Sequence, residues 1–207
     1  MGLSIHYQAL PEQSTLFKRL QTEKAFNTLF YHLFKGGNGI LDMFDLDKEE
    51  REEILEWMVE DEEVFSSEVE VERYLNELCL ELKCAEAVHP GLVNRHAYLE
   101  KDHQYIEELL SQELKRKELN NYIDYLEKLL YSNQKLAPKL HEQYEDQLLL
   151  VPSSVIQDSS LMLHEVEKAW FEITGGIFED RWGRIQRWIK FYIESADKGE
   201  AVVIRFS

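Results

Sequence analysis

The chain begins and ends with short segments in which apolar residues alternate with other residues, and this pattern constrains the fold most. LSIHYQAL, at residues 3–10, places its apolar side chains on one side and serine, histidine and glutamine on the other. GEAVVIRFS, at residues 199–207, alternates in the same way. A period of two predicts strands, the first of them half-buried. We expect the two strands to pair in one small sheet, which ties down both termini.

Helical patterns fill the chain between these two strands. A sheet of two strands is only marginally stable, so we expect a third strand within residues 147–151. The predicted fold class is a helix-rich α+β domain spanning residues 1–207, with the acidic segment 42–86 as a candidate sub-lobe. Helices are predicted at residues 14–20, 22–35, 47–60, 69–87, within 101–150 with breaks near 120–121 and 137–138, and at 159–174. The stretch 175–192 supplies a last helix that continues to about residue 196.

The start of the third predicted helix imitates a calcium-binding loop. Counting from Asp45, carboxylates fall at loop positions 1, 3, 5, 9 and 12. The sixth position of such a loop needs glycine for its sharp turn, and Glu50 stands there. We therefore expect a helix start, with Asp47 as the N-cap and Glu50 closing a capping box.

The negative charge is concentrated in one segment. The chain has a net charge of -17, and residues 42–86 carry 18 acidic against 4 basic residues. Such a field repels nucleic acids and anionic membranes and attracts basic proteins, as in toxin-neutralising immunity proteins. The alternative is that the acidic residues only keep the protein soluble. No apolar run spans a bilayer and no signal peptide is visible, so we expect a cytoplasmic protein without membrane contact.

No catalytic motif stands out. The sequence has no nucleophile elbow, no P-loop and no dinucleotide fingerprint, so we expect no cofactor and a non-catalytic binding protein. His96, Glu100 and His103 would share one face of an unbroken helix and form a metal set. Alternatively Asp102 begins the helix and His96 precedes it in a loop. The two cysteines, five residues apart, are expected to be buried free thiols, with no metal bound.

The stretch GGIFEDRWGRIQRWIKFY, residues 175–192, combines basic and aromatic side chains in this acidic chain. On a helix, Trp182, Ile185, Ile189 and Tyr192 fall on one face. Basic residues at 181, 184, 187 and 190 wind around the helix, since each step of three turns by about -60°. This geometry favours a packing helix over nucleic-acid binding. It leaves the alternative of a protein that binds a small molecule or anion, with or without enzymatic activity, in a pocket formed by Arg181, Trp182, Arg184 and Trp188.

Several short motifs resemble the uncharacterised YfbM-like domain family of bacterial proteins. Lys24 and Ala25 match an early Lys-Ala-Trp helix, although Phe26 replaces the tryptophan. The Tyr-Leu pair at residues 98–99 matches a mid-chain signal, and Ala196 with Gly199 matches the passage from an aromatic helix into the last strand. The resemblance implies an α+β fold with the termini together, and it supplies no catalytic residues.

Overall fold

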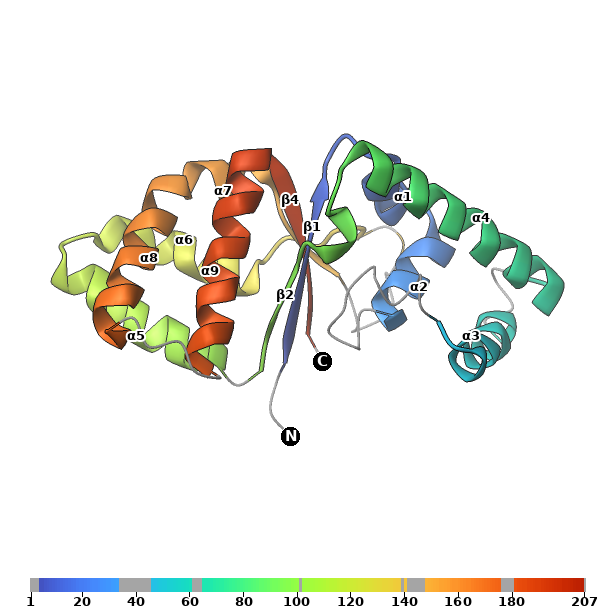
Figure 1. Cartoon of the computed structure of the whole chain (residues 1–207), viewed down its shortest axis with the longest axis horizontal. Helices are drawn as coiled ribbons and strands as arrows, with labels where there is room; N and C mark the ends of the chain where they lie inside the picture. The colour runs from blue at the N-terminus through green and yellow to red at the C-terminus, as the bar shows by residue number, and fades with distance from the viewer. Residues whose placement is uncertain are drawn as a thin grey trace.

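The computed structural model contains one antiparallel sheet of four strands, β1 (Ile5–Pro11), β2 (His96–Leu99), β3 (Leu149–Val151) and β4 (Glu200–Phe206), in the order β2-β1-β4-β3. The terminal strands β1 and β4 are the two central strands, and Figure 1 shows the start of β1 and the end of β4 at the same end of the sheet. The structure describes residues 4–33, 46–60, 65–100, 102–138, 140, 148–175 and 181–206.

The predicted pairing of the terminal strands is confirmed, with Ile5 opposite Phe206 and Pro11 opposite Glu200. The expected third strand is confirmed as β3, which pairs with the other edge of β4. Strand β2 was not predicted, because its four residues are too few to display a period. The α+β class follows from these strands and the helices around them.

Helices cover both faces of the sheet (Figure 1). One group lies between β1 and β2 in the chain, and the other lies after β2. The first group is α1 (Thr15–Thr22), α2 (Lys24–Leu33), α3 (Lys48–Glu60) and α4 (Glu68–Val88). The second is α5 (Asp102–Arg116), α6 (Ile123–Tyr131), α7 (Ser153–Asp158), α8 (Ser160–Thr174) and α9 (Arg181–Lys198). None of the described helices is long and apolar enough to span a membrane.

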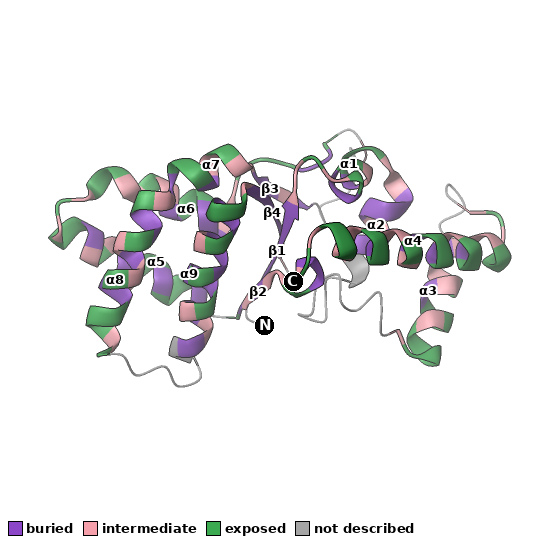
Figure 2. Ribbon diagram, turned by 45° about the horizontal axis from the view of Figure 1, so that its top comes forward, coloured by how far each residue is buried: buried purple, intermediate pink, exposed green. Residues whose placement is uncertain are grey.

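Each face of the sheet has its own apolar core, and Figure 2 shows the buried positions gathered on the sheet and the inward helix faces. Ile5, Tyr7 and Ala9 pack with α5–α9, whereas Leu10 and Val203 pack with α1–α4. The acidic segment belongs to the core on the α1–α4 side of the sheet, since Ile54 and other residues of α3 and α4 lie in that core.

The prediction of a half-buried first strand is wrong. His6 and Gln8, expected on an exposed face, are buried, because α1–α4 form a second helical layer over that face. The Gln8 side chain is satisfied there by main-chain oxygens: its Nε2 donates to Arg95 at 2.9 Å and to Leu92 at 3.3 Å. Strand β1 is therefore covered by helices on both faces, and neither face is exposed to solvent.

Helix boundaries follow the local chemistry of the sequence. The capping box is confirmed, because Glu50 N donates to Asp47 Oδ1 at 2.9 Å and Asp47 N donates to Glu50 Oε2 at 3.0 Å. Thr22, predicted to cap α2, instead ends α1 and donates its hydroxyl to Lys18 O. Gly175 ends α8 in the left-handed conformation, with φ of 60°. The stop predicted at residues 36–37 lies outside the described residues.

A row of polar side chains crosses the sheet under α2. His6 lies opposite Arg205 on β4 and opposite Tyr98 on β2, with 4.7 Å between the His6 and Tyr98 ring centroids. The guanidinium of Arg205 stacks on the ring of Tyr31 at 4.2 Å. Burial, reinforced by the charge of Arg205, lowers the pKa of His6 from 6.5 to about 4.

This pKa predicts that the fold weakens in mild acid. The unfolded chain protonates His6 near pH 6.5 and the folded protein only near pH 4, so protons favour unfolding in between. We expect His6 to contribute a loss of about 2 kcal/mol in unfolding free energy between pH 7 and pH 5. Urea unfolding of the wild type and His6→Gln at both pH values checks this, and equal pH slopes would contradict it.

Candidate functional site

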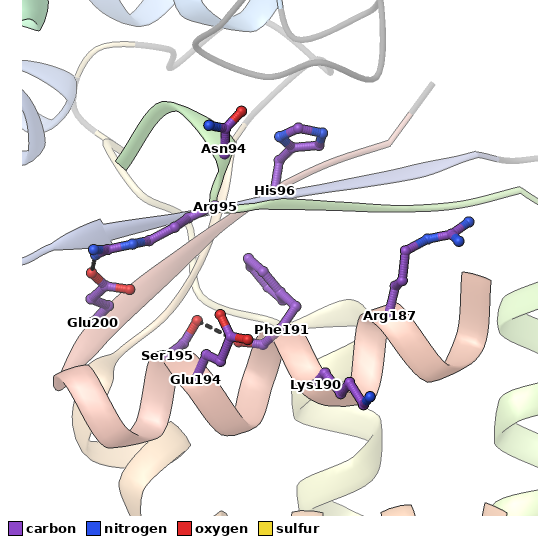
Figure 3. Close-up of a pocket in the computed structure, with 9 residues that line it drawn as sticks. All are labelled: Asn94, Arg95, His96, Arg187, Lys190, Phe191, Glu194, Ser195 and Glu200. Atoms are coloured by element: carbon purple, nitrogen blue, oxygen red, sulfur yellow. Dashed lines mark hydrogen bonds and ion pairs between the residues drawn. The ribbon is translucent and has the colours of Figure 1, made fainter. Parts of the chain in front are cut away.

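A cleft of about 210 Å³ lies between the start of β2 and the C-terminal half of α9 (Figure 3). Strand β2 and the residues before it supply one wall, α9 supplies the other, and the first residue of β4 closes one end. The cleft is lined by Asn94, Arg95, His96, Arg187, Lys190, Phe191, Glu194, Ser195 and Glu200.

The wall from β2 is fixed by a short turn that precedes it. Helix α4 ends at Val88, and Gly91 adopts φ of 82°, a conformation that suits glycine. The carboxylate of Glu86 accepts from the N–H groups of Gly91 and Val93, at 2.5 and 3.0 Å. The carbonyl of Arg95 then accepts from Ala9 N at 2.9 Å, so the main chain is held against β1.

A buried ion pair joins Arg95 to Glu200 at one end of the cleft (Figure 3). The side chain of Glu200 is 2% exposed and that of Arg95 is 13% exposed. Arg95 Nη2 also donates to Pro90 O at 2.9 Å. Burial lowers the pKa of Arg95, while the carboxylates of Glu86 and Glu194 act in the opposite direction. The pair is expensive to desolvate and depends on good geometry.

The ion pair leaves two polar atoms unsatisfied. Within the part of the chain that the structure describes, Glu200 Oε2 and Arg95 Nε are buried and have no hydrogen-bond partner. Buried polar atoms of folded proteins nearly always have partners, so such exceptions call for an explanation. One is an acceptor and the other a donor, and both belong to residues that line the cleft.

Helix α9 adds charged groups to the opposite wall. Arg187, Lys190 and Glu194 are exposed, and their spacing of three and four places them along one face. Among the described residues, neither Arg187 nor Lys190 forms an ion pair. The Phe191 side chain points from α9 toward β2 and gives the cleft an apolar surface. Three cations and two carboxylates therefore line the cleft of a strongly acidic chain.

The lining residues of this cleft can bind a ligand. Ser195, its one hydroxyl group, donates to Phe191 O at 2.8 Å and is bonded to its own helix. A nucleophile needs an adjacent base within hydrogen-bond reach, and no such pair is found among the described lining residues. Charged and apolar surfaces side by side suit a small polar ligand.

The predicted pocket residues on α9 have other environments. Arg184 donates from Nε to Asp102 Oδ2 at 2.9 Å and lies 3.7 Å from Glu100 Oε2. Trp188 is fully buried, with its ring against Tyr7 and Tyr192. Arg184 and Trp188 therefore belong to an ion pair and to the core rather than to this cleft. Arg181 and Trp182 lie in α9, but their side chains fall outside the described residues, so their part of the prediction stays open.

The continuous helix on which the candidate metal set depends does not form. His96 lies in strand β2, whereas His103 lies in α5, which begins at Asp102 as the alternative proposed. His103 Nδ1 contacts Glu100 O at 2.8 Å. The described residues contain no cluster of three or more metal-ligating side chains.

The cysteines are free thiols, as expected, but the prediction that they are buried is wrong. Cys79 is half-buried and Cys84 is exposed. The apolar face of α4 runs through Val71, Leu75, Leu78 and Leu82, and Cys84 lies off that face.

A second cleft, of about 260 Å³, lies beside the end of α6. Its charged residues are Asp124, Glu127 and Lys128, so it is acidic. Lys128 stacks on Tyr125 at 5.1 Å, and Tyr131 donates to Glu107 at 2.8 Å. No buried unsatisfied atom belongs to its described lining. The cleft on α9 is therefore the stronger candidate.

Sequence reasoning missed Arg95 and Glu200, which form the buried part of the site. Glu200 stands directly after a glycine and before four apolar residues of a terminal strand. A carboxylate in that place signals a buried charge that needs a partner. Arg187 and Lys190 belong to the basic series noted on α9, but the pattern alone did not show which of its members face a cleft.

The resemblance to the YfbM-like family stays a prediction. No family model matches the chain, and neither a curated protein nor a solved structure shows a significant match to it.

Proposed function

We propose that the protein is a non-catalytic binding protein for a small anionic ligand, which it holds in the cleft between β2 and α9. One observation carries the proposal: Arg187 and Lys190 face the cleft, and neither has an ion-pair partner among the described residues. Exposed cations of an acidic protein have many carboxylates to pair with. Two that stay unpaired along one wall of a cleft form an anion-binding surface.

The size of the cleft limits the ligand. Pockets for drug-sized molecules have volumes of about 300 to 1,000 Å³. The volume here is about 210 Å³, which suits a metabolite of a few heavy atoms. Phe191 offers apolar contact for a short carbon chain, while the charged residues surround it (Figure 3).

Titration with butyrate, followed by amide chemical shifts, tests this function. We expect saturable shifts in α9 and β2, and a loss of affinity of about tenfold or more in the Arg187→Gln/Lys190→Gln variant. The control is Lys115→Gln/Lys168→Gln, which removes the same charge at exposed sites outside the cleft. Equal losses in both variants, or no saturable shift, would contradict the proposal.

A regular stripe of carboxylates on α3 favours a second function, recognition of a basic protein. Helices α3 and α4 contain twelve glutamates against four basic residues. Several of these glutamates bind other groups of the protein. Glu81 pairs with Arg19, and Glu86 accepts hydrogen bonds from the turn before β2. Four others are exposed at spacings of four, three and four: Glu49, Glu53, Glu56 and Glu60.

The stripe lies opposite the buried residues Ile54 and Met58 of α3. Like charges three and four residues apart on a helix repel one another, so the stripe destabilises α3 in isolation. A basic partner removes that repulsion and is steered toward the helix by the field. This supports the immunity-like function expected from the charge distribution.

Oligolysine binding tests the second function. We expect the affinity to fall steeply as salt is raised to about 0.5 M, since salt screens exposed charges. Changing all four stripe glutamates to glutamine should weaken binding by about tenfold more than a matched set of Glu108, Asp124, Glu127 and Asp158 changed to the corresponding amides. Equal effects of the two sets would mean that only net charge matters.

A further inference from the structure

Charged groups of opposite sign lie along the length of the cleft on α9. Figure 3 shows the Arg95–Glu200 pair at one end, Arg187 at the other end, and Lys190 and Glu194 between them on α9. Lys190 and Glu194 are one helical turn apart, about 6 Å along the axis. A ligand lying along α9 therefore meets Arg187 and Lys190 toward one end, and toward the other end it meets Glu194 and the ion pair of Glu200 with Arg95.

The unsatisfied oxygen of Glu200 defines what the acidic end requires. Oε2 is buried and lacks a partner among the described residues, although Oε1 is paired with Arg95. A carboxylate oxygen only accepts hydrogen bonds, so the missing partner is an N–H or O–H group. Glu194 adds a second carboxylate at this end. An ammonium group fits best, because its hydrogen bonds to carboxylates are charge-assisted.

We infer that the ligand of this cleft is a small zwitterion, with an ammonium group toward Glu194 and Glu200 and a carboxylate or phosphate toward Lys190 and Arg187. The inference rests on the proposed anion-binding function and narrows its ligand class. A simple anion satisfies the basic end but leaves Oε2 of Glu200 without a donor. A simple amine satisfies the acidic end and leaves the two cations unpaired.

A series of matched small molecules tests the inference on the full-length protein. The probes are glycine, 4-aminobutyrate and 6-aminohexanoate, which differ in the distance between ammonium and carboxylate. Butyrate and hexanoate match the two longer zwitterions as anions, and butylamine and hexylamine match them as cations. We expect one zwitterion to bind about tenfold or more tightly than the anion and the amine of similar length.

Glu194→Gln separates the two ends of the cleft. Glu194 is exposed, so its replacement should leave the fold intact. We expect this variant to bind the preferred zwitterion about three- to tenfold more weakly and to bind butyrate at least as well as the wild type. The control is Asp197→Asn, which removes an exposed carboxylate of the same helix that does not line the cleft.

The outcomes distinguish this inference from the function on which it rests. If butyrate binds and depends on Arg187 and Lys190, but no zwitterion binds more tightly, the inference fails and the anion-binding function stands. If Glu194→Gln weakens butyrate and zwitterion equally, the inference also fails. If butylamine binds as tightly as every zwitterion, the inference fails as well. If neither anions nor zwitterions bind, both proposals are overturned.

Discussion

The Glu200→Ala variant is expected to lose about 3 to 5 kcal/mol of unfolding free energy. The change leaves the guanidinium of Arg95 in a largely buried environment without its carboxylate partner. Removing one member of a buried pair costs more than the pair contributes, because the remaining charge stays desolvated. Urea unfolding at pH 7, monitored by tryptophan fluorescence, measures the loss.

The double variant Arg95→Met/Glu200→Leu provides the control for this result. It removes both charges and refills the space with apolar side chains, so we expect it to recover most of the lost stability. The single variants Arg95→Met and Glu200→Leu complete the double-mutant cycle, and the coupling in it gives the interaction energy. A loss below about 1 kcal/mol in Glu200→Ala would mean that water solvates Arg95, and that the pair is a surface salt bridge.

Trp188→Ala is expected to destabilise the fold by a similar amount, about 3 to 5 kcal/mol. The indole is fully buried, and its centroid lies 5.1 Å from that of Tyr192 and 6.2 Å from that of Tyr7. Those two tyrosines donate their hydroxyls to Leu129 O and Leu130 O of α6. Removing the indole therefore opens a cavity where α9, α6 and β1 meet.

Phe171→Ala on α8 is the matched control for the aromatic deletion. The Phe171 side chain is 57% exposed, so its loss should change stability by less than about 1 kcal/mol. Thermal unfolding compares the two variants with the wild type. Similar losses at both sites, or a small loss at Trp188, would contradict the placement of the indole in the core.

Much of the architecture could be predicted from periodicity. The terminal strands alternate with period two, and the capping box at Asp47 marks the beginning of α3. The prediction that failed was that one face of β1 is exposed. Histidine and glutamine on β1 look like solvent-facing residues, and only the second helical layer shows that they are buried. The alternation of apolar and polar residues shows only which types of side chain lie on each face of a strand. Whether a face is buried depends on elements far away in the chain.

The candidate site was predicted only to the level of one helix. The basic series on α9 was recognised, and so was the apolar face through Ile185, Ile189 and Tyr192. The sequence does not show which arginine of α9 forms an ion pair, because the partner of Arg184 is Asp102, which lies in α5. Likewise Arg95 and Glu200 meet across more than a hundred residues. One sequence gives no measure of such distant pairings, so the cleft emerged only from the fold.

The order of the strands has a consequence for how this chain folds during synthesis. Strand β4 inserts between β1 and β3, and its residues pair with partners in β1 that lie roughly 190 to 200 positions earlier in the chain. Until β4 leaves the ribosome, β1 and β3 each present an open edge, which can pair with other chains. The layer of α1–α4 can form before β4 is made, because its main helix contacts join neighbours in the chain, α1 with α2 and α3 with α4. Completion of the sheet is therefore a late, high-contact-order step, and a chaperone that shields β1 would act in that interval.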